Sequence, residues 1–465
     1  MERRGIRLGR RAGAQLLLAA VLLAAAPARA DPGPGSGGPT PRTASPGATG
    51  RIEDQRWAFH AQTTLTAQFH PAFESHYRGP QSLDPAARGD ETWDLTAFVG
   101  VRLWRGLELW INPEIDQGFG LSNTTGIAGF PSGEAYKVGA AEPYGRVQRL
   151  FLRQVVNLGG ARQTVDPGLN QLGGSQTADH VVITLGKFSV GDVFDLNAYA
   201  HDPRHDFLNW AIIDTLTFDY AADSWGYIPG ISVELYKGDW VFRQGLFDLS
   251  NQPNSTRYDA RFDQFQVIEE IERDYALLQR DGKVRLTGWL SRGRMGSFSD
   301  AIRLSEATGA PADIAAVRRY QSREGIGLNA EQEVSEDLGL FLRAGWADGF
   351  QEPFEFTDVD RTVAAGVSLK GAGWGRPDDT LGSGFAVNGI SRIHQEFFND
   401  GGLGIVIGDG RLPHPGLEQI FETYYDVSVA DGVAFTFDYQ FINNPAYNTD
   451  RGPVNVLGVR LHGQF

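Results

Sequence analysis

Two histidines and two aspartates stand close together in the stretch 201–206. His201 and His205 are four residues apart, and Asp202 and Asp206 lie beside them. On a helix, this spacing could bring two imidazoles to one zinc ion. Pro203 lies between the histidines and favours a loop instead. We therefore predict no metal site and no cofactor here.

Two further patterns resemble nucleotide-binding or catalytic motifs only in outline. The glycines of the stretch 402–408 lack the Gly-x-Gly-x-x-Gly spacing of a dinucleotide loop, and no helical pattern follows them. The chain contains no Gly-x-Ser-x-Gly elbow. It also contains no cysteine, which excludes thiolate metal sites and cysteine nucleophiles. These observations predict that the protein is not an enzyme.

Charged and aromatic side chains instead recur at every second position of many segments. In the segment 94–104, Leu95, Val99 and Val101 alternate with Thr96 and Arg102. This is the period of a β-strand, in which successive side chains point to opposite faces. Similar alternation continues to the C-terminus. The predicted polar faces carry Arg102, Glu108, Arg149, Arg153, Glu234, Arg285, Trp289, Arg343 and Asp438.

The alternating segments follow one another as hairpins over almost the whole chain, without a second pattern that would mark another domain. A transmembrane barrel turns its apolar face to lipid and its polar face to a wet lumen. Such barrels use about 25 residues for each strand with its connection, so about 415 residues predict some sixteen strands. We therefore predict an all-β fold, a transmembrane antiparallel β-barrel. Aromatic residues near strand ends predict interfacial girdles; they are Trp104, Trp110, Trp225, Trp240, Tyr424 and Tyr425.

Three segments depart from the strand pattern. Apolar residues at helical spacing predict a short loop helix over Glu269–Gln279. A similar tendency predicts helix within Ala301–Tyr320, around a Gly-Ala-Pro break. The stretch Gly191–Trp210 is long, polar and rich in aspartate, and we predict that it is a loop that folds into the barrel.

The N-terminus has the composition of an export signal. Five arginines precede a short apolar run, Ala14–Ala26, and Ala28-Arg29-Ala30 fits a small-x-small cleavage site. We predict a signal peptide over residues 1–30, a disordered segment rich in Pro and Gly over 31–52, and a barrel domain over 53–465. Removing residues 1–30 takes away six arginines and one glutamate, and the net charge becomes about −20. Nucleic-acid binding needs the opposite sign.

The final strand carries the sharpest local signal. Leu457, Val459, Leu461 and Phe465 share the apolar face of an alternating segment that ends the chain on an aromatic residue. A terminal aromatic residue in phase with such a strand is the usual address for the barrel-assembly machinery. We therefore predict that Phe465 is an assembly signal.

Four blocks of sequence resemble the carbohydrate-selective porins of the OprB type. They are Leu107–Gly118 (LELWINPEIDQG), Gly186–Trp210 (GKFSVGDVFDLNAYAHDPRHDFLNW), Gly401–Gly410 (GGLGIVIGDG) and Asn444–Val454 (NPAYNTDRGPV). The resemblance extends over almost all of the chain from Trp57 to Phe465. It implies an outer-membrane barrel of about sixteen strands in a bacterium, associated with the uptake of glucose and related sugars.

The expected function is thus the diffusion of small sugars through a polar lumen. We expect outer-membrane lipid, lipopolysaccharide and the assembly machinery as partners; the sequence leaves monomer and homo-oligomer open. For the narrow zone we predict the Arg149–Arg153 face, with Glu108 and Glu234 across the lumen, since opposed charges order water and favour solutes rich in hydroxyls. The alternatives are an outer-membrane barrel enzyme and a secreted β-rich carbohydrate-binding protein.

Overall fold

The alternating segments close into a single antiparallel barrel. The computed structural model describes residues 54–465, apart from 136, 259, 260 and 357. This part of the chain contains sixteen strands, each hydrogen-bonded to its neighbours in sequence, and β1 closes the cylinder against β16. The prediction of about sixteen antiparallel strands is confirmed. The strands are β1 (Trp57–His70), β2 (Arg88–Trp104), β3 (Leu107–Gly118), β4 (Ala140–Val165), β5 (Gly174–Phe188), β6 (Ile228–Lys237), β7 (Trp240–Asp248), β8 (Phe265–Leu277), β9 (Arg280–Met295), β10 (Arg319–Glu333), β11 (Leu338–Ala347), β12 (Arg361–Gly371), β13 (Arg376–Gly389), β14 (Glu418–Ala430), β15 (Val433–Asn443) and β16 (Val454–Gln464).

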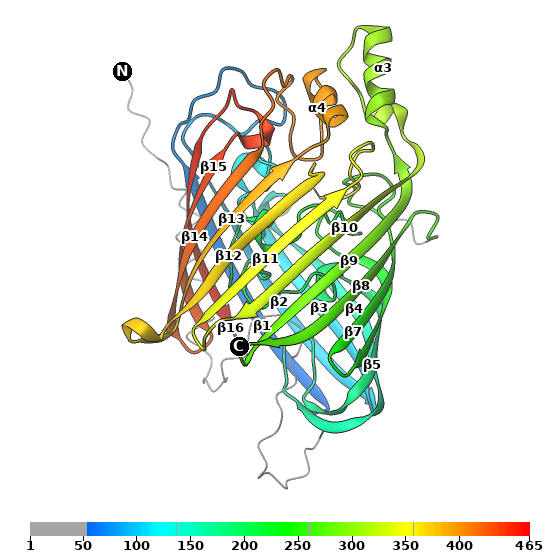
Figure 1. Cartoon of the computed structure of the whole chain (residues 1–465), viewed down its shortest axis with the longest axis vertical. Coiled ribbons are helices and arrows are strands. Elements are labelled where there is room, and N and C mark those ends of the chain that lie inside the picture. The colour runs from blue at the N-terminus through cyan, green and yellow to red at the C-terminus, as the bar shows by residue number, and fades with distance from the viewer. Residues whose placement is uncertain (1–53, 136, 259–260, 357) are drawn as a thin grey trace.

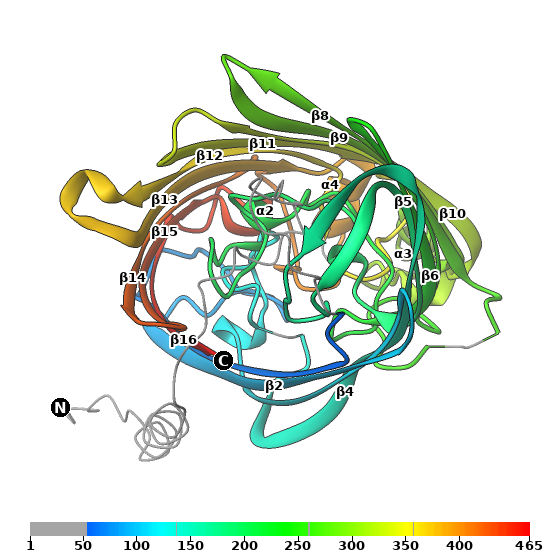
Figure 2. The same cartoon turned by 90° about the horizontal axis from the view of Figure 1, so that it is seen from below.

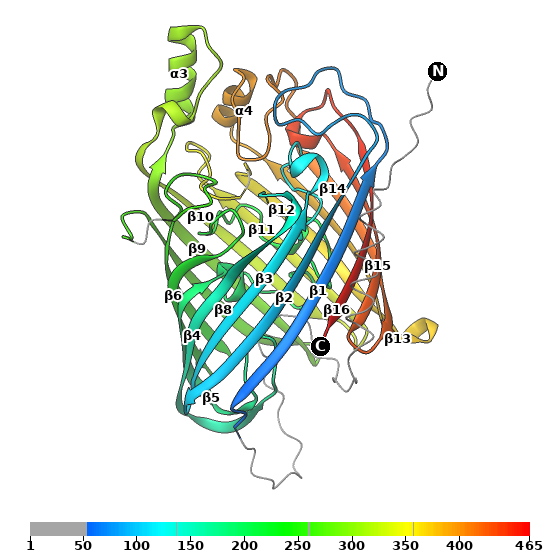
Figure 3. The same ribbon diagram turned by 180° about the vertical axis from the view of Figure 1, so that it is seen from behind.

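The seam between the first and last strands is regular. Leu65 pairs with Leu461 and Ala67 with Val459, and Figure 3 shows β1 beside β16. Phe465 extends this pairing, because its backbone exchanges hydrogen bonds of 2.8 and 2.9 Å with Ala61. Closure leaves no free sheet edge, which is the condition for placing a sheet in lipid.

The two faces of the wall follow the alternation of the sequence. Val99 is 42% exposed on the outside, whereas Thr96 is fully buried inside. The outer face is lined by apolar side chains along the strands, such as Leu185, Leu286 and Leu457. The predicted girdle is partly wrong: Trp104, Trp240 and Tyr425 are on the outer surface, but Trp110, Trp225 and Tyr424 are buried inside the barrel. These three aromatic side chains pack within the lumen, so their position near strand ends did not reveal their face.

The two ends of the barrel differ. Short turns join the strands at the end where β16 finishes, and long loops join them at the other end (Figure 1). In outer-membrane barrels, the long loops are extracellular. The loops and turns carry η1 (Leu121–Asn123), η2 (Val190–Asp192), α2 (Trp210–Ile213), α3 (Phe298–Thr308), η3 (Ala315–Val317), η4 (Ala372–Trp374), α4 (Arg392–Asn399) and η5 (Pro445–Tyr447).

One predicted helix is present and the other is wrong. Helix α3 and η3 fall within or beside the predicted Ala301–Tyr320 region. The stretch Glu269–Gln279 is instead strand β8 and a tight turn. Ile268 is fully buried inside and Ile271 is 44% exposed outside. A spacing of three places residues on opposite faces of a strand, and here both faces accept an apolar side chain.

The long loop 189–227, between β5 and β6, folds into the barrel. Figure 2 shows α2 inside the ring of strands. Phe207, Ala211 and Ile212 of this loop are fully buried against wall residues such as Phe341 and Ala386. The expectation that Gly191–Trp210 folds inward is confirmed. The loop occupies part of the lumen and therefore positions the groups that a solute would meet.

In the part of the chain that the structure describes, no helix is both long enough and apolar enough to cross a bilayer. The predicted signal peptide over residues 1–30 and the segment 31–52 lie outside the described residues.

Candidate functional site

An acidic stripe runs along the inner wall on β2 and β3. It consists of Asp94, Glu114 and Asp116, all buried, and Asp94 pairs directly with Asp116 in the strand register. Thr96 Oγ1 donates a 2.6 Å hydrogen bond to Glu114, and Gln148 Nε2 donates one of 3.2 Å to the same carboxylate. Crowded like charges destabilise a sheet, and two arginines lie beside this stripe: Arg146 pairs with Glu114, and Arg204 lies 3.8 Å from Asp94.

A basic stripe lies on the adjacent strands β4 and β5. It consists of Arg146, Arg149 and Lys187, and Arg146 pairs with Glu114 of the acidic stripe across the β3–β4 ladder. Asp223 of the long loop lies 3.1 Å from Arg146 Nη2 and 3.4 Å from Lys187 Nζ. The two stripes therefore run side by side along one part of the wall.

Two arginines of the basic stripe lie over aromatic rings of the long loop. The Arg146 guanidinium carbon lies 3.4 Å from the centroid of the Trp225 ring, and that of Arg149 lies 4.8 Å from the Tyr227 ring. Trp225 Nε1 donates a 3.0 Å hydrogen bond to the Tyr144 hydroxyl. A guanidinium is planar, so stacking on an aromatic face holds it in place and leaves its edge free to donate hydrogen bonds.

The long loop presents to each stripe a charge of the opposite sign. Asp192 accepts two hydrogen bonds from Arg149, of 2.6 and 2.8 Å. Arg204 Nη1 lies 3.4 Å from Glu134, and its Nη2 lies 3.8 Å from Asp94. The side chains of Arg146, Arg149, Lys187, Asp192 and Arg204 retain 14–31% exposure. These groups are therefore open to water inside the barrel.

Three of the predicted residues meet at the short-turn end of the barrel. Arg102, Glu108 and Arg153 line a cavity of about 210 Å³. Arg102 donates to the carbonyl oxygens of Gln55 and Gly173 at 2.9 and 3.1 Å, and it forms a 3.3 Å ion pair with Glu108. Arg102 thus holds the turn 166–173 in place. In the described part of the chain, no carboxylate forms an ion pair with Arg153.

The predicted arrangement across the lumen is wrong for Glu108. Glu108 lies on β3 and pairs directly with Arg153 of β4, so it stands beside that arginine and not opposite it. Glu234 of β6 is also engaged: it accepts hydrogen bonds from Tyr236 at 2.7 Å and from Arg243 at 3.3 Å. A strand phase predicts the face of a residue but not which strand lies across the barrel.

Arg285 belongs to a buried ion-pair network on β7–β10. It lies 2.6 Å from Glu272 and 3.0 Å from Glu331, and Arg243 binds Glu270 and Glu272 in the same network. The arginine side chains here are only 3–4% exposed. This network braces the wall and is shielded from water.

Three more predicted residues contact the long loop or its surroundings. Arg343 donates to the Ile212 carbonyl at 2.8 Å and to the Asp195 carbonyl at 3.2 Å. Trp289 lies beside Phe218, with ring centroids 6.4 Å apart. Asp438 accepts a 3.0 Å hydrogen bond from Gln440. All three are buried, so they support the loop and the wall.

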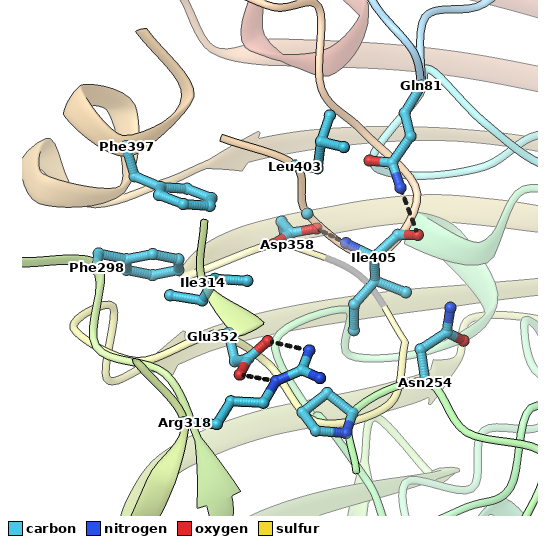
Figure 4. Close-up of a pocket in the computed structure, with 12 residues that line it drawn as sticks. Gln81, Asn254, Phe298, Ile314, Arg318, Glu352, Asp358, Phe397, Leu403 and Ile405 are labelled. Atoms are coloured by element: carbon cyan, nitrogen blue, oxygen red, sulfur yellow. Dashed lines mark hydrogen bonds and ion pairs between the residues drawn. The ribbon is translucent and has the colours of Figure 1, made fainter. Parts of the chain in front are cut away.

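A second cavity lies among the long loops, at the end that carries α3 and α4 (Figure 4). Its volume is about 170 Å³, and Phe298, Ile314, Phe397 and Leu403 line one part of it. Arg318 binds Glu352 through hydrogen bonds of 2.7 and 2.9 Å. Burial raises the pKa of the Glu352 carboxyl above its usual value, although Arg318 acts in the opposite direction. Residues from five loops line this cavity, so the loops pack against one another around it.

His394 of α4 connects the loop 390–417 to the loop that precedes β12. His394 is fully buried and lies 3.1 Å from Asp360 and 3.2 Å from Asp358. Burial lowers the pKa of His394, but the two carboxylates outweigh this effect and the net shift is upward. The pKa of Asp360 is lowered, because His394, Arg323 and the Ser391 backbone outweigh its burial.

The histidines singled out as metal candidates lie apart. His201 Nε2 lies 3.0 Å from the Gly191 carbonyl oxygen, whereas the His205 ring meets the His462 ring edge-on at 4.4 Å. Within the described ranges, no group of three or more His, Asp or Glu side chains is placed to hold a metal ion.

Sequence reasoning missed Arg146, Lys187, Arg204, Trp225 and Tyr227. A bulge between Asn112 and Pro113 of β3 and their partners on β4 shifts the phase of β4. Arg146 and Gln148 point inward before the shift, and Arg149 and Phe151 point inward after it. If the alternation of β4 is read separately on each side of the bulge, Arg146 is placed on the inner face. Arg204, Trp225 and Tyr227 lie in the long loop, where no alternation indicates which side chains point inward.

The chain matches the family described as carbohydrate-selective porin, OprB family, over residues 81–465. Among solved structures, it is similar to OprB of Pseudomonas putida in its high-pH structure, with a TM-score of 0.66 and 16% identity over 88% of this chain and 94% of that chain. It is also similar to the channel DcaP of Acinetobacter baumannii, with a TM-score of 0.47 and 9% identity over 88% of this chain and 97% of that chain. No curated protein sequence matches it.

Proposed function

The chain belongs to the OprB family of carbohydrate-selective porins, and we propose that its sugars pass along the acidic and basic stripes beside the loop 189–227. It is an outer-membrane porin that lets sugars diffuse through a sixteen-stranded barrel. Membership of this family of channels favours a porin over an enzyme. The closed barrel with an apolar outer face favours a membrane channel over a secreted carbohydrate-binding protein.

One observation carries the proposed route: water-accessible arginines stacked on aromatic rings, next to a row of carboxylates. Arg146 lies on Trp225 and Arg149 on Tyr227. Sugars are neutral and present many hydroxyl groups that can hydrogen-bond to both signs of charge. Each contact must remain weak, because a solute that binds tightly does not leave the pore.

The route is tested by sugar flux into proteoliposomes as the glucose concentration is raised. A stripe that binds sugar makes the flux saturate. In Arg146→Ala combined with Arg149→Ala, we expect the flux to become linear with concentration. Arg392→Ala is the matched control, since Arg392 is highly exposed on α4, outside the lumen. A double variant that still saturates at the wild-type concentration would place the sugar path elsewhere.

The cellular setting is a further part of this proposal, because the family match begins only at residue 81. We infer export by the signal peptide over residues 1–30, a disordered segment rich in Pro and Gly over 31–52, and insertion into a bacterial outer membrane containing lipopolysaccharide. The paired backbone of Phe465 at the seam supports a role in recognition by the barrel-assembly machinery. Arg149 and Arg153, the earlier candidates for the narrow zone, take separate roles in this proposal: Arg149 lies in the basic stripe and Arg153 near the exit.

A further inference from the structure

The cavity at the short-turn end contains two arginine side chains without partners. Arg153 extends into it from the inner face of β4, and Arg105 from the turn between β2 and β3. Within the described residues, neither guanidinium forms an ion pair or a hydrogen bond. Arg105 is exposed and Arg153 is partly exposed. Their N–H groups are therefore available to a solute in the cavity.

The carboxylate next to Arg153 is already engaged elsewhere. Glu108 is the partner of Arg153 in the β3–β4 register. One Glu108 oxygen accepts hydrogen bonds from Trp110 Nε1 at 3.0 Å and from the Leu172 backbone N–H at 3.3 Å. The other oxygen lies 3.3 Å from Arg102. Glu108 therefore compensates the charge of Arg102 and leaves that of Arg153 without a paired carboxylate.

The second carboxylate of the cavity, Asp54, lies on the side of Arg102. A Cβ atom added to Gly174 would stand 2.9 Å from Asp54 Oδ1 and 3.4 Å from Arg102 Nη2, so both groups lie beside this glycine. Three arginines and two carboxylates line the cavity, which gives it a net charge of +1. In a strongly acidic chain, a cavity of the opposite sign attracts anions.

Neutral polar groups complete the lining of the cavity. Asn157, Ser175 and Gln176 contribute to it. Asn157 Oδ1 accepts a 2.8 Å hydrogen bond from the Thr177 backbone N–H. In the part of the chain that the structure describes, the Asn157 amide NH2 group and the Ser175 hydroxyl make no hydrogen bond. Both can therefore bind hydroxyl groups of a solute whose anionic group lies at the arginines.

We propose that this cavity binds the anionic group of an acidic sugar through Arg105 and Arg153. A guanidinium binds a carboxylate or phosphate through two parallel hydrogen bonds, which a neutral sugar cannot accept in the same charge-assisted form. The short turns of outer-membrane barrels face the periplasm, so a solute reaches this cavity as it leaves the lumen. The inference rests on the proposed sugar path and extends its substrates from neutral sugars to sugar acids. Because the arginines are open to water, the solute can leave again.

Block of the ion current through single channels tests the site, with the salt concentration held constant. In the wild type, gluconate and glucuronate should block the current at a lower concentration than glucose does. In Arg105→Gln combined with Arg153→Gln, the half-blocking concentration of both acids should rise roughly tenfold, since charge-assisted hydrogen bonds are lost. The half-blocking concentration of glucose should rise much less. The comparison in the wild type needs no variant, so the proposal can be tested even if the double variant does not fold.

Arg56→Gln combined with Arg162→Gln is the matched control. Both arginines are exposed at the same end of the barrel and lie outside the cavity, so the control removes the same charge and should leave the block by the acids unchanged. Equal loss of block in the two double variants would reduce the effect to overall charge and overturn the proposal.

The remaining outcomes separate this site from the sugar path on which it rests. Acids that block no better than glucose in the wild type would overturn the site. Inorganic phosphate that blocks as strongly as gluconate would also overturn it, because the cavity would then recognise a free anion and not a sugar. Glucose that causes no block would contradict the proposed sugar path, whereas a block by gluconate that the double variant weakens would still support the site.

Discussion

Arginines inside this barrel serve two purposes, and their exposure separates them. Arg343 and Arg323 are fully buried and bind backbone carbonyls or aspartates of the loops. Arg146 and Arg149 stay partly exposed and lie on aromatic rings. A buried guanidinium with several hydrogen-bond acceptors holds a loop in place, whereas a water-accessible guanidinium can also hydrogen-bond to a solute.

Arg102 and Arg153 line one cavity and should respond differently to truncation. Arg153 has no ion-pair partner in the described chain, so Arg153→Ala should remove a positive charge from the path and shift the channel towards cations. Arg102→Ala should also release the turn 166–173, which it holds through Gln55 and Gly173. The reversal potential in a salt gradient measures the first effect, and protease cleavage of the turn measures the second.

The distinction fails if Arg153→Ala opens the turn as much as Arg102→Ala does. It also fails if Arg153→Ala leaves the reversal potential of the parent channel unchanged. In either case, Arg153 would be part of the scaffold and not of the solute path.

At the scale of strands and loops, the alternation predicted the barrel and the face of most wall residues, and the chain length predicted the strand number. This worked because lipid on one side and a polar lumen on the other impose a strict period of two. The alternation failed where the inside is also apolar, as around Ile268 of β8, which packs in a core with Phe218 and Phe194 of the long loop. It failed again at the β4 bulge, where one extra residue reverses the phase.

The candidate site was less predictable than the wall for a physical reason. Half of it comes from the loop 189–227, whose residues Asp192, Arg204, Trp225 and Tyr227 are placed by packing inside the lumen. No local period determines which wall strand such a residue contacts. The sequence indicated that the loop folds inward but not which charges it brings to which stripe.

The strand phase predicts a strong asymmetry for charge on β2. Val99→Arg places a cation on the lipid face and should destabilise the barrel by about 2–4 kcal/mol if the site lies near the midplane. Val99→Leu keeps the apolar face and should fold as the parent does. Urea unfolding in lipid vesicles, followed by tryptophan fluorescence, measures the difference. Equal stability of the two variants would mean that Val99 does not face lipid.

The loop 390–417 should loosen as pH rises. The pKa of His394 is raised above 6.5, so the stabilisation by its charged form is complete below that value and is lost as pH rises through the folded pKa. The pKa of Asp360 is lowered below 3.8, so its contribution persists above that value and is lost only as pH falls through the lower folded pKa. The loop is therefore held most firmly between pH 3.8 and pH 6.5, where both contributions are complete.

Chymotrypsin cleavage at Phe397 and Phe398 reports this opening, because both rings are buried while the loop is docked. Cleavage rates, normalised to an unfolded peptide at each pH, should rise between pH 6 and pH 9. His394→Gln should flatten this rise. A wild-type rate that is independent of pH would show that the His394 contacts do not hold the loop.

At the scale of the whole molecule, the seam between β1 and β16 closes the barrel, and we expect it to be needed for insertion into the outer membrane. Deleting Phe465 removes two backbone hydrogen bonds to Ala61 and the terminal aromatic residue. We expect less heat-modifiable barrel in the outer membrane and more aggregate in the periplasm. Phe465→Tyr keeps the backbone and an aromatic ring and should restore the yield. An unchanged yield after deletion would remove Phe465 from the assembly signal.

The whole molecule also combines a strongly acidic chain with basic groups placed along its lumen. A net charge of about −20 without the signal peptide favours cations near both mouths. Arg146, Arg149, Lys187 and Arg204 offset that bias inside, where the long loop narrows the lumen. A path with both signs of charge and little net preference suits neutral solutes rich in hydroxyl groups.

Single-channel recording in a planar bilayer, with glucose added in steps, tests the central claim most directly. The structure predicts steady open channels whose current falls as glucose enters, with a decrease that saturates because the stripes bind the sugar. Channels that conduct ions but keep the same current at every glucose concentration, beyond the change in bulk conductivity, would contradict a carbohydrate-selective path. A protein that forms no channels at all would contradict the porin itself.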